Sequence, residues 1–346
     1  MKKNTSILIL SYIEKNELCS SKQICDGLQV SIGYATVKRL LKKLIVNKLI
    51  VAVGNGKATR YNVSSTYRLT QTINVDDYFK LEIDEREISN NFNHLLIKET
   101  LQKSVLFTSE ELKKLNELQE KYKSNCSKLS KTEYNKELER LAIDLSWKSS
   151  QIEGNTYSLL ETERLLKEKE TATGKTKDEA VMLLNHKATL DFIISNPDYI
   201  KPLSVSCIED IHSILIKDLD IARNIRRTRV GISGTNYKPL DNEFQIKEAL
   251  EDLCKLVNSQ KNVFTQSLLV LVLLSYIQAF ADGNKRTARL VSNAILINNN
   301  ICPISFRTVD SIEYKKAMLI FYEQNNINSF KEIFINQFEF AVNTYF

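Results

Sequence analysis

Phe280-Ala-Asp-Gly-Asn-Lys-Arg-Thr-Ala-Arg289 is the stretch that decides the fold, and it follows a long apolar run. A Gly-Asn turn at this place predicts the end of one helix and the start of another. The backbone N–H groups of Gly283, Asn284 and Lys285 can then converge on an anion at the second helix's N-terminus. The helix dipole favours negative charge there. The stretch therefore predicts a phosphate site.

The side chains of the same stretch support a polyphosphate ligand. Arg286 and Arg289 are three positions apart, so they share one helix face and can bind further phosphates with bidentate hydrogen bonds. Asp282 offers a hard oxygen to Mg²⁺, an ion that usually accompanies a polyphosphate. We therefore expect a nucleotide with Mg²⁺, with Asp282 as the metal ligand.

Residues 278–289 resemble the Fic motif, H-P-F-x-D/E-G-N-G/K-R-x-x-R. The positions that fit it are Phe280, Asp282, Gly283, Asn284, Lys285, Arg286 and Arg289. Two positions depart from it. Ala279 stands where proline is usual, and Gln278 stands where the family has its histidine.

Two further segments resemble parts of Fic proteins, so that the resemblance covers roughly residues 140–310. Ser149–Gly154 resembles the inhibitory motif S/T-x-x-x-E-G/N, with Glu153 as its carboxylate. Arg223–Pro239 resembles the flap, a β-hairpin that holds the target peptide as an added strand. The target-binding residues expected in it are Gly231, Ile232, Ser233 and Gly234.

The resemblance implies a protein adenylyltransferase that uses ATP and Mg²⁺. In the family, the histidine takes a proton from a hydroxyl of the target protein, and the hydroxyl then attacks the α-phosphate of ATP. The product is an AMP-modified Ser, Thr or Tyr. The implied partners are ATP and a protein substrate, which includes the chain itself.

Gln278 puts the catalytic step in question. Its amide forms hydrogen bonds but has no usable pKa near neutrality. A positioned general base contributes ~10²–10⁴-fold, so we expect transfer to be weak or absent. Neither His212, expected to pack within an amphipathic helix, nor Tyr276, with a reference pKa of about 10, replaces the base convincingly.

Glu153 is expected to act as an inhibitor. The resemblance implies that it pairs with Arg289, which removes the partner of the γ-phosphate. An internal carboxylate and an incoming phosphate then compete for one guanidinium. The alternative is that Glu153 only caps a helix or forms a surface ion pair.

Composition limits the class of protein. The 346 residues suffice for two or more domains, and 9 Gly with 4 Pro suit a mostly helical chain. The six cysteines form no C-x-x-C pair, which argues against zinc and redox motifs and fits a reducing cytoplasm. No apolar run is long enough to span a bilayer, so no membrane partner is expected.

Residues 1–65 form a basic module, with eleven Lys and Arg against three Asp and Glu. Such an excess indicates a polyanionic partner. The expected elements are helices over Thr5–Lys15, from Ser20 and over Ser31–Leu44, then strands Leu49–Val53 and Arg60–Val63 around Gly54–Lys57. Within the third helix Leu40, Leu41, Leu44 and Ile45 should face inward. This order resembles a winged helix-turn-helix, whose third helix reads DNA.

The expected DNA contacts are Tyr34, Thr36, Lys38, Arg39, Lys57 and Arg60. The alternative is that the module binds protein and that its lysines are merely solvated. Salt separates the two, because phosphate contacts make affinity fall steeply with ionic strength. Homodimerisation of the chain stays open.

The predicted fold is mostly α-helical. Its domains are a winged helix-turn-helix (1–65), a connector with a helical segment (66–140) and a Fic-like domain with the flap (141–346), whose inhibitory helix spans about 141–155. Two functions remain. One is an autoinhibited, weak or inactive adenylyltransferase coupled to DNA binding. The other is a non-catalytic transcriptional regulator that uses its Fic-like domain to sense nucleotide or to dimerise.

Overall fold

The structure is a computed structural model that describes residues 2–28, 30 and 32–346. It divides into two compact units. The N-terminal unit comprises Met1–Thr72 and Glu99–Val105, and the helical body comprises Ile73–Lys98 and Leu106–Phe346. The predicted middle segment, 66–140, is thus shared between the two units and forms no body of its own.

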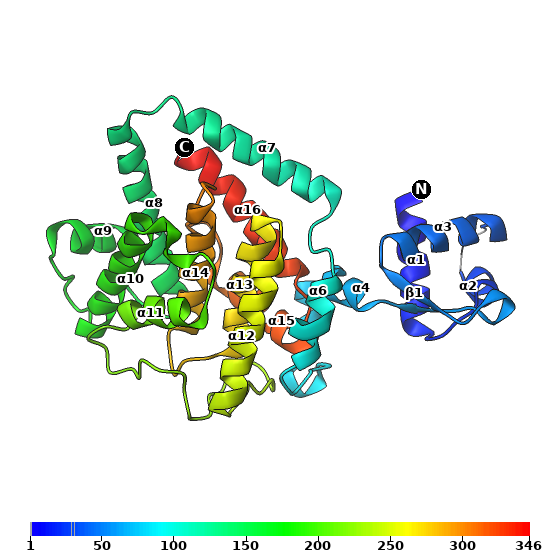
Figure 1. The fold of residues 1–346 in the computed structure, drawn as a ribbon. Helices are drawn as coiled ribbons and strands as arrows, with labels where there is room; N and C mark the ends of the chain where they lie inside the picture. The colour runs from blue at the N-terminus through cyan, green and yellow to red at the C-terminus, as the bar shows by residue number, and fades with distance from the viewer. Residues whose placement is uncertain (1, 29, 31) are drawn as a thin grey trace. The chain divides into compact units, whose positions relative to one another are not determined.

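The N-terminal unit has three helices followed by a two-stranded hairpin (Figure 1). The elements are α1 (Lys2–Lys15), α2 (Ser21–Gly27), α3 (Tyr34–Val46), β1 (Ile50–Val53), η1 (Gly56–Ala58), β2 (Arg60–Val63), α4 (Ser65–Thr70) and α6 (Leu101–Lys103). The strands are antiparallel, with Ile50 opposite Val63. This is the expected order of elements, and its identification as a winged helix stays a prediction.

Local sequence explains where these helices begin and which face they bury. Ser20 caps α2 and forms the expected capping box with Gln23. Helix α3 begins at Tyr34 after the N-cap Gly33, later than predicted, and Ser31 lies outside the described residues.

The buried positions of α3 are Val37, Leu41 and Leu44, which recur at helical spacing. The expectation that Ile45 faces inward is wrong, because its side chain is 38% exposed. Residues one position apart point about 100° apart on a helix, so Leu44 and Ile45 do not share the buried stripe.

The helical body contains the remaining helices. They are α5 (Val75–Tyr78), η2 (Ile83–Glu85), α7 (Ser109–Cys126), α8 (Lys131–Ile152), α9 (Leu159–Glu168), α10 (Lys177–Ser195), η4 (Pro197–Ile200), α11 (Val205–Leu215), α12 (Glu243–Ser259), α13 (Val263–Ile277), α14 (Asn284–Asn298), α15 (Ser311–Gln324) and α16 (Asn328–Thr344). The short π-helix η3 (Leu96–Thr100) lies where the two units meet along the chain.

Helix α13 forms the centre of this body. It is buried from Ser267 to Ile277, as a helix that is apolar on every face must be. It packs against α12, α14, α15 and α16, while α14 also contacts α8, α10 and α11. Within the described part of the chain, no helix has the length and apolar character needed to cross a membrane. The mostly helical fold class is therefore as predicted.

The flap differs from its prediction. Residues 223–239 contain no strand, and their single bridge joins Lys238 to Asn91 in the parallel sense. The only sheet among the described residues is β1–β2. Here the ends of the segment are held by the side chain of Arg226, which binds backbone carbonyls in place of a strand ladder.

Candidate functional site

The turn between α13 and α14 has the backbone shape that the sequence predicts. Helix α13 ends at Ile277, and its C-cap Gln278 is left-handed, with φ 53° and ψ 55°. Gly283 is the N-cap of α14 and has φ 80°. A glycine suits this place because side chains make left-handed backbone unfavourable.

The start of α14 presents free amides. Its first hydrogen bond runs from Thr287 N to Gly283 O at 2.8 Å, so the N–H groups of Asn284, Lys285 and Arg286 have no intrahelical acceptor. The Asn284 side chain closes the loop: its Oδ1 accepts from Phe280 N at 2.8 Å, and its Nδ2 donates to Phe280 O at 2.7 Å. Sequence reasoning assigned Asn284 only a backbone role and missed this one.

Arg286 is a buried cation with unused donors. It is 1% exposed, and its Nη2 donates to Asp282 Oδ2 at 2.9 Å. Its Nε and Nη1 atoms are buried and have no hydrogen-bond partner. Buried polar groups are nearly always paired in native proteins, so these two donors indicate a ligand or water.

Arg289 and Glu153 form the ion pair that the resemblance implies. Glu153 directly follows α8, and its Oε1 accepts from Arg289 Nη2 at 3.0 Å. Its Oε2 accepts from Lys285 Nζ at 3.1 Å, a contact that was not expected. Arg289 is fully buried and also donates to Ser149 Oγ and Ser149 O, both at 2.8 Å.

Arg289 and Lys285 stabilise the negative charge of Glu153. Burial alone would raise the pKa of its carboxyl group, but Arg289 and Lys285 outweigh burial and lower that pKa. Glu153 is therefore an anion at neutral pH. It occupies donors on two of the three cationic side chains at the start of α14.

The side chain of Gln278 is turned into the protein. It is 9% exposed, and its Nε2 donates to Ser275 O at 2.6 Å. Its Oε1 accepts from Asn284 Nδ2 at 3.2 Å. The amide thus links the last turn of α13 to Asn284, and both of its polar atoms have protein partners.

Two buried histidines lie beneath the site. His212 donates from Nε2 to Asp282 O at 3.0 Å and stacks on Phe280, with ring centroids 3.7 Å apart. Burial lowers its pKa to about 4. His186 hydrogen-bonds to Ser146 through Nδ1 at 3.2 Å, and burial, followed by Arg289 and Arg286, places its pKa well below the usual range. No sequence pattern marked His186.

Arg226 is the second residue that sequence reasoning missed. It is 3% exposed, and its Nε donates to Gln278 O at 2.6 Å. Its Nη1 donates to Thr228 O at 2.8 Å and its Nη2 to Leu240 O. It therefore ties both ends of the flap to the end of α13.

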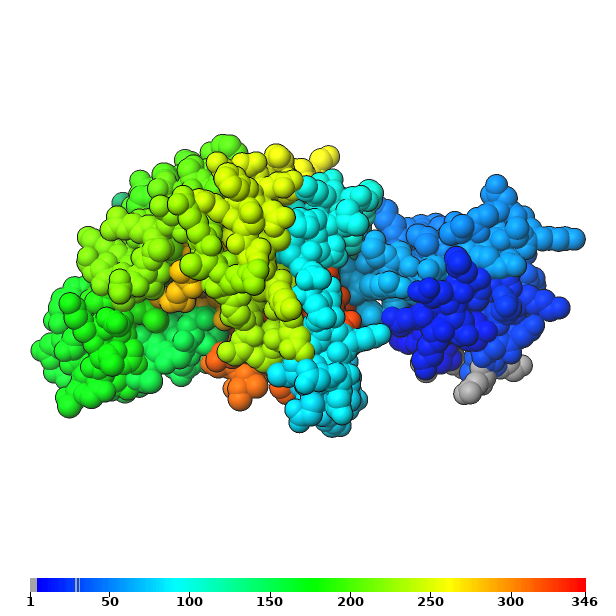
Figure 2. All heavy atoms as spheres, turned by 90° about the horizontal axis from the view of Figure 1, so that it is seen from below, coloured from blue at the N-terminus to red at the C-terminus, as the bar shows by residue number. Residues whose placement is uncertain are grey.

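The expected flap residues lie at the tip of this loop. Gly231, Ser233 and Gly234 are exposed, Ile232 is partly buried, and Gly234 has φ 88° in a turn. Seen from below in Figure 2, the body is hollowed where orange atoms of α14 lie between green segments and the yellow-green stretch that includes the flap. The side chains of Asp282 and Lys285 at the start of α14 are 63% and 25% exposed, and Arg226 of the flap donates to Ala279 O nearby.

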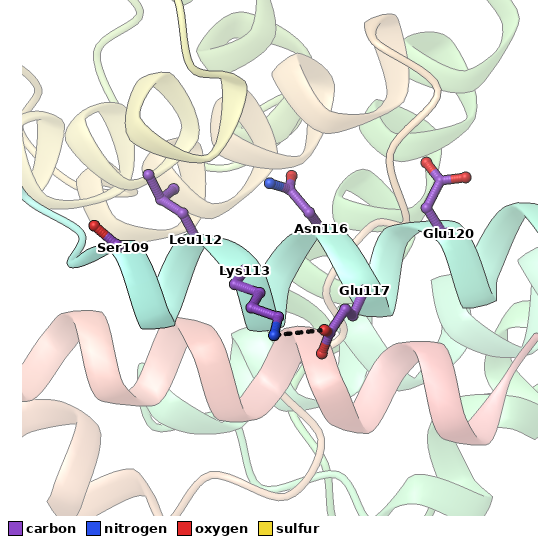
Figure 3. A pocket seen from close by; sticks show the side chains of 6 residues that line it. All are labelled: Ser109, Leu112, Lys113, Asn116, Glu117 and Glu120. Carbon is purple, nitrogen blue, oxygen red and sulfur yellow. Dashed lines mark ion pairs between the residues drawn. The ribbon is translucent and has the colours of Figure 1, made fainter.

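A separate depression lies on α7 and contains no predicted site residue. It is lined by residues of that helix alone: Ser109, Leu112, Lys113, Asn116, Glu117 and Glu120 (Figure 3). Lys113 pairs there with Glu117 at 3.8 Å. Its walls come from one helix and offer mainly solvated side chains, so it has no part in the site above.

The residues expected to contact DNA are spread over α3 and the hairpin. Tyr34, Lys38, Arg39 and Lys57 are exposed, and Thr36 and Arg60 are partly buried. Lys38 Nζ lies 5.0 Å from the centre of the Tyr34 ring. The Arg60 guanidinium donates to Thr59 O at 3.2 Å. Their contact with DNA stays a prediction.

Comparison with known proteins identifies the family of this site. Residues 202–296 match the Fic/DOC family. Protein adenylyltransferase fic-1 of Caenorhabditis elegans is 26% identical over 176 residues, which are 48% of this chain and 34% of that protein. Protein adenylyltransferase Fic of Nematostella vectensis is 28% identical over 180 residues, 48% of this chain and 40% of that protein. The chain thus matches well under half the length of these relatives.

Solved structures share the fold. Fic-1 of Caenorhabditis elegans superposes with a TM-score of 0.60 at 21% identity, covering 68% of this chain and 72% of that one. A Fic domain containing signaling protein from Bacteroides thetaiotaomicron gives a TM-score of 0.56 at 20% identity, with 66% and 95% covered. The family model thus detects a Fic/DOC domain at residues 202–296, and the solved structures share its fold.

Proposed function

We propose that the start of α14 binds the polyphosphate of ATP. The observation that carries the proposal is the group of unused donors there: the free amides of the first turn and the buried Nε and Nη1 atoms of Arg286. A helix N-terminus with free amides is a ready anion site. Arg286 and Arg289 then hold the β- and γ-phosphates, and the backbone at Gly283 and the next two residues forms the anion nest.

The residues present also fit a magnesium ion that enters with the nucleotide. Asp282 has a side chain 63% exposed whose one hydrogen-bond partner among the described residues is Arg286, so one carboxylate oxygen is available to a hard cation. The described residues contain no group of three metal-ligating side chains. One protein ligand suits a magnesium ion held mainly by phosphates and water, where it neutralises phosphate charge.

The proposed reaction is transfer of AMP from ATP to a hydroxyl group of a protein, in weak or vestigial form. The curated relatives are named protein adenylyltransferases. Gln278 stands at the base position and cannot take a proton from the attacking hydroxyl. A missing general base slows such a step by ~10²–10⁴-fold, while phosphate positioning remains.

Glu153 is proposed to restrain this site. Its carboxylate binds Arg289 and Lys285 at 3.0 and 3.1 Å, so it occupies the Nη2 donor of Arg289 that a γ-phosphate there would also use. The competition is between two anions for the same donors. The arrangement lowers ATP affinity and disfavours a productive pose.

The test compares four forms of the full chain: wild type, Glu153→Gly, Gln278→His and the double variant. Each is incubated with ATP labelled at the α-phosphate, and label is scored on the chain itself and in a cell lysate. We expect little label on wild type and most on the double variant. Failure of the double variant to exceed wild type would contradict a transferase site.

The second candidate is a non-catalytic regulator that binds DNA. It is favoured by the inward-turned Gln278 amide and by the exposed cations of α3 and the hairpin. In this case nucleotide binding changes DNA affinity or dimerisation and no AMP is transferred. Label acquired only by forms with Gln278→His, with DNA affinity that falls steeply with salt, supports this candidate.

A further inference from the structure

The flap carries charge of one sign. Residues 223–238 contain no Asp or Glu and five cations, Arg223, Arg226, Arg227, Arg229 and Lys238. Four of these are exposed, and only Arg226 is buried. The side chains of Arg227 and Arg229 are 80% and 86% exposed. The segment is therefore a cationic surface beside the candidate site.

The acids nearest to these arginines leave them available. Arg227 Nε lies 2.7 Å from Glu243, and Arg229 Nε lies 2.9 Å from Asp241. Both pairs are exposed to water, where an ion pair contributes little and exchanges readily. An incoming carboxylate can replace either acid at little net cost.

The backbone of the flap tip is unpaired. Among the described residues, 229–234 make no backbone hydrogen bond, and the segment's backbone N–H bonds lie nearer its ends, at Arg226, Tyr237 and Lys238. Unpaired N–H and C=O groups along a loop can pair with the main chain of another polypeptide. A nucleic acid has no main chain of alternating N–H and C=O groups to match them.

The ends of the flap are already held by hydrogen bonds in the free protein. Arg226 joins Thr228 O and Leu240 O to Gln278 O through one guanidinium. Its own amide donates to Ala279 O at 3.0 Å. A loop already held in place loses less conformational freedom when it binds a partner.

We propose that the flap recognises an acidic, extended segment of a partner protein. The partner's main chain pairs with the backbone of residues 229–234, and its carboxylates bind Arg227 and Arg229. The inference rests on the proposed function, because it names the class of polypeptide that is brought beside the nucleotide. The resemblance already implies that a target peptide pairs with the flap; the new claim is that this peptide segment is acidic.

The test measures fluorescence anisotropy with the full chain and four labelled probes. They are a ten-residue peptide with alternating Asp or Glu, the same peptide with Asn or Gln in those places, the same peptide with Lys in those places, and a single-stranded oligonucleotide. The variant reverses two charges, Arg227→Glu with Arg229→Glu. Its matched control is Lys113→Glu with Lys123→Glu on α7, two exposed cations that also pair with exposed acids.

We expect wild type and the α7 control to bind the acidic peptide at least tenfold more tightly than the amide peptide. The flap variant should lose this preference and gain affinity for a peptide with Lys in the acidic positions. Three results would overturn the inference: equal or no binding of the two peptides, acidic binding that survives in the flap variant, or a flap that binds only the oligonucleotide. ATP titration of the same variants separates failure of this inference from failure of the nucleotide site, since neither arginine belongs to it.

Discussion

Replacing Glu153 with Gln should tighten ATP binding while lowering the stability of the free protein. The substitution keeps the shape of the side chain and removes its charge. Glu153 binds the buried Arg289 at 3.0 Å and the part-exposed Lys285 at 3.1 Å. Both cations belong to the proposed phosphate site, so we expect bound ATP to compete with Glu153 for them.

The magnitude follows from these two contacts. A hydrogen bond to a charged group contributes about 1.5–3 kcal/mol, and a more exposed ion pair about 0–1 kcal/mol. The Arg289 contact is the more buried one, because the Arg289 side chain is 0% exposed and that of Lys285 25%. It should dominate, and Gln retains a weaker bond to Arg289. The loss is therefore at most about 1.5–3 kcal/mol, which corresponds to at most roughly 10–150-fold in the ATP dissociation constant.

Calorimetric titration with ATP–Mg²⁺ measures the gain in affinity, and unfolding of the free chain measures the loss in stability. The matched control is Glu120→Gln on α7, whose carboxylate is 72% exposed and pairs with Lys123. It should change neither quantity. Equal ATP affinity in the Glu153 variant and wild type, within twofold, would refute the competition. A loss of stability without a gain in affinity would make Glu153 a structural residue only.

Three further predictions concern charge and the loop's supports. Arg289 and Lys285 outweigh burial and lower the pKa of Glu153 below its usual 4.5. The effect of Glu153 on ATP affinity should therefore be constant from pH 6 to 8 and fade only as the pH falls through that lowered pKa. ATP titrations of wild type and Glu153→Gln across this pH range check the prediction. Burial lowers the pKa of His212 from 6.5 to about 4, so its neutral form stabilises the fold above about pH 6.5 and this contribution is lost towards pH 4. At about 1.4 kcal/mol per unit, His212→Asn should flatten the pH dependence of urea unfolding by roughly 3 kcal/mol. Arg226→Met removes the donor from two buried carbonyls and one part-buried carbonyl and should destabilise the body by about 3–5 kcal/mol, against about 0.5 kcal/mol or less for the exposed control Arg227→Met.

Local sequence signals predicted much of the fold because they act within a few residues. The capping box at Ser20 and the turn at Gly283 each specify a helix start without reference to distant contacts. The motif also brought Arg286 and Arg289 to one helix face, where the structure has them. The pairing of Arg289 with Glu153, 136 residues apart, came only from the resemblance.

The features that were missed depend on contacts that no local pattern records. The flap was expected to be a hairpin, and it is a loop in which the side chain of Arg226 binds the carbonyls of Thr228 and Leu240. Arg226 lies among the exposed residues Arg223, Arg227 and Arg229, and nothing in the sequence distinguishes it as the buried one. The Lys285 contact with Glu153 likewise depends on where α8 ends in space.

The loop around Gln278 is held by contacts that do not involve the side chain at the position of the missing base. The left-handed backbone of Gln278 is held through its carbonyl by Arg226, and Asn284 closes the loop through Phe280. Neither of these contacts needs a particular side chain at position 278. The shape of this turn, the proposed phosphate site, can therefore persist without a base at position 278, because the atoms that shape it are not the atoms that would accept a proton.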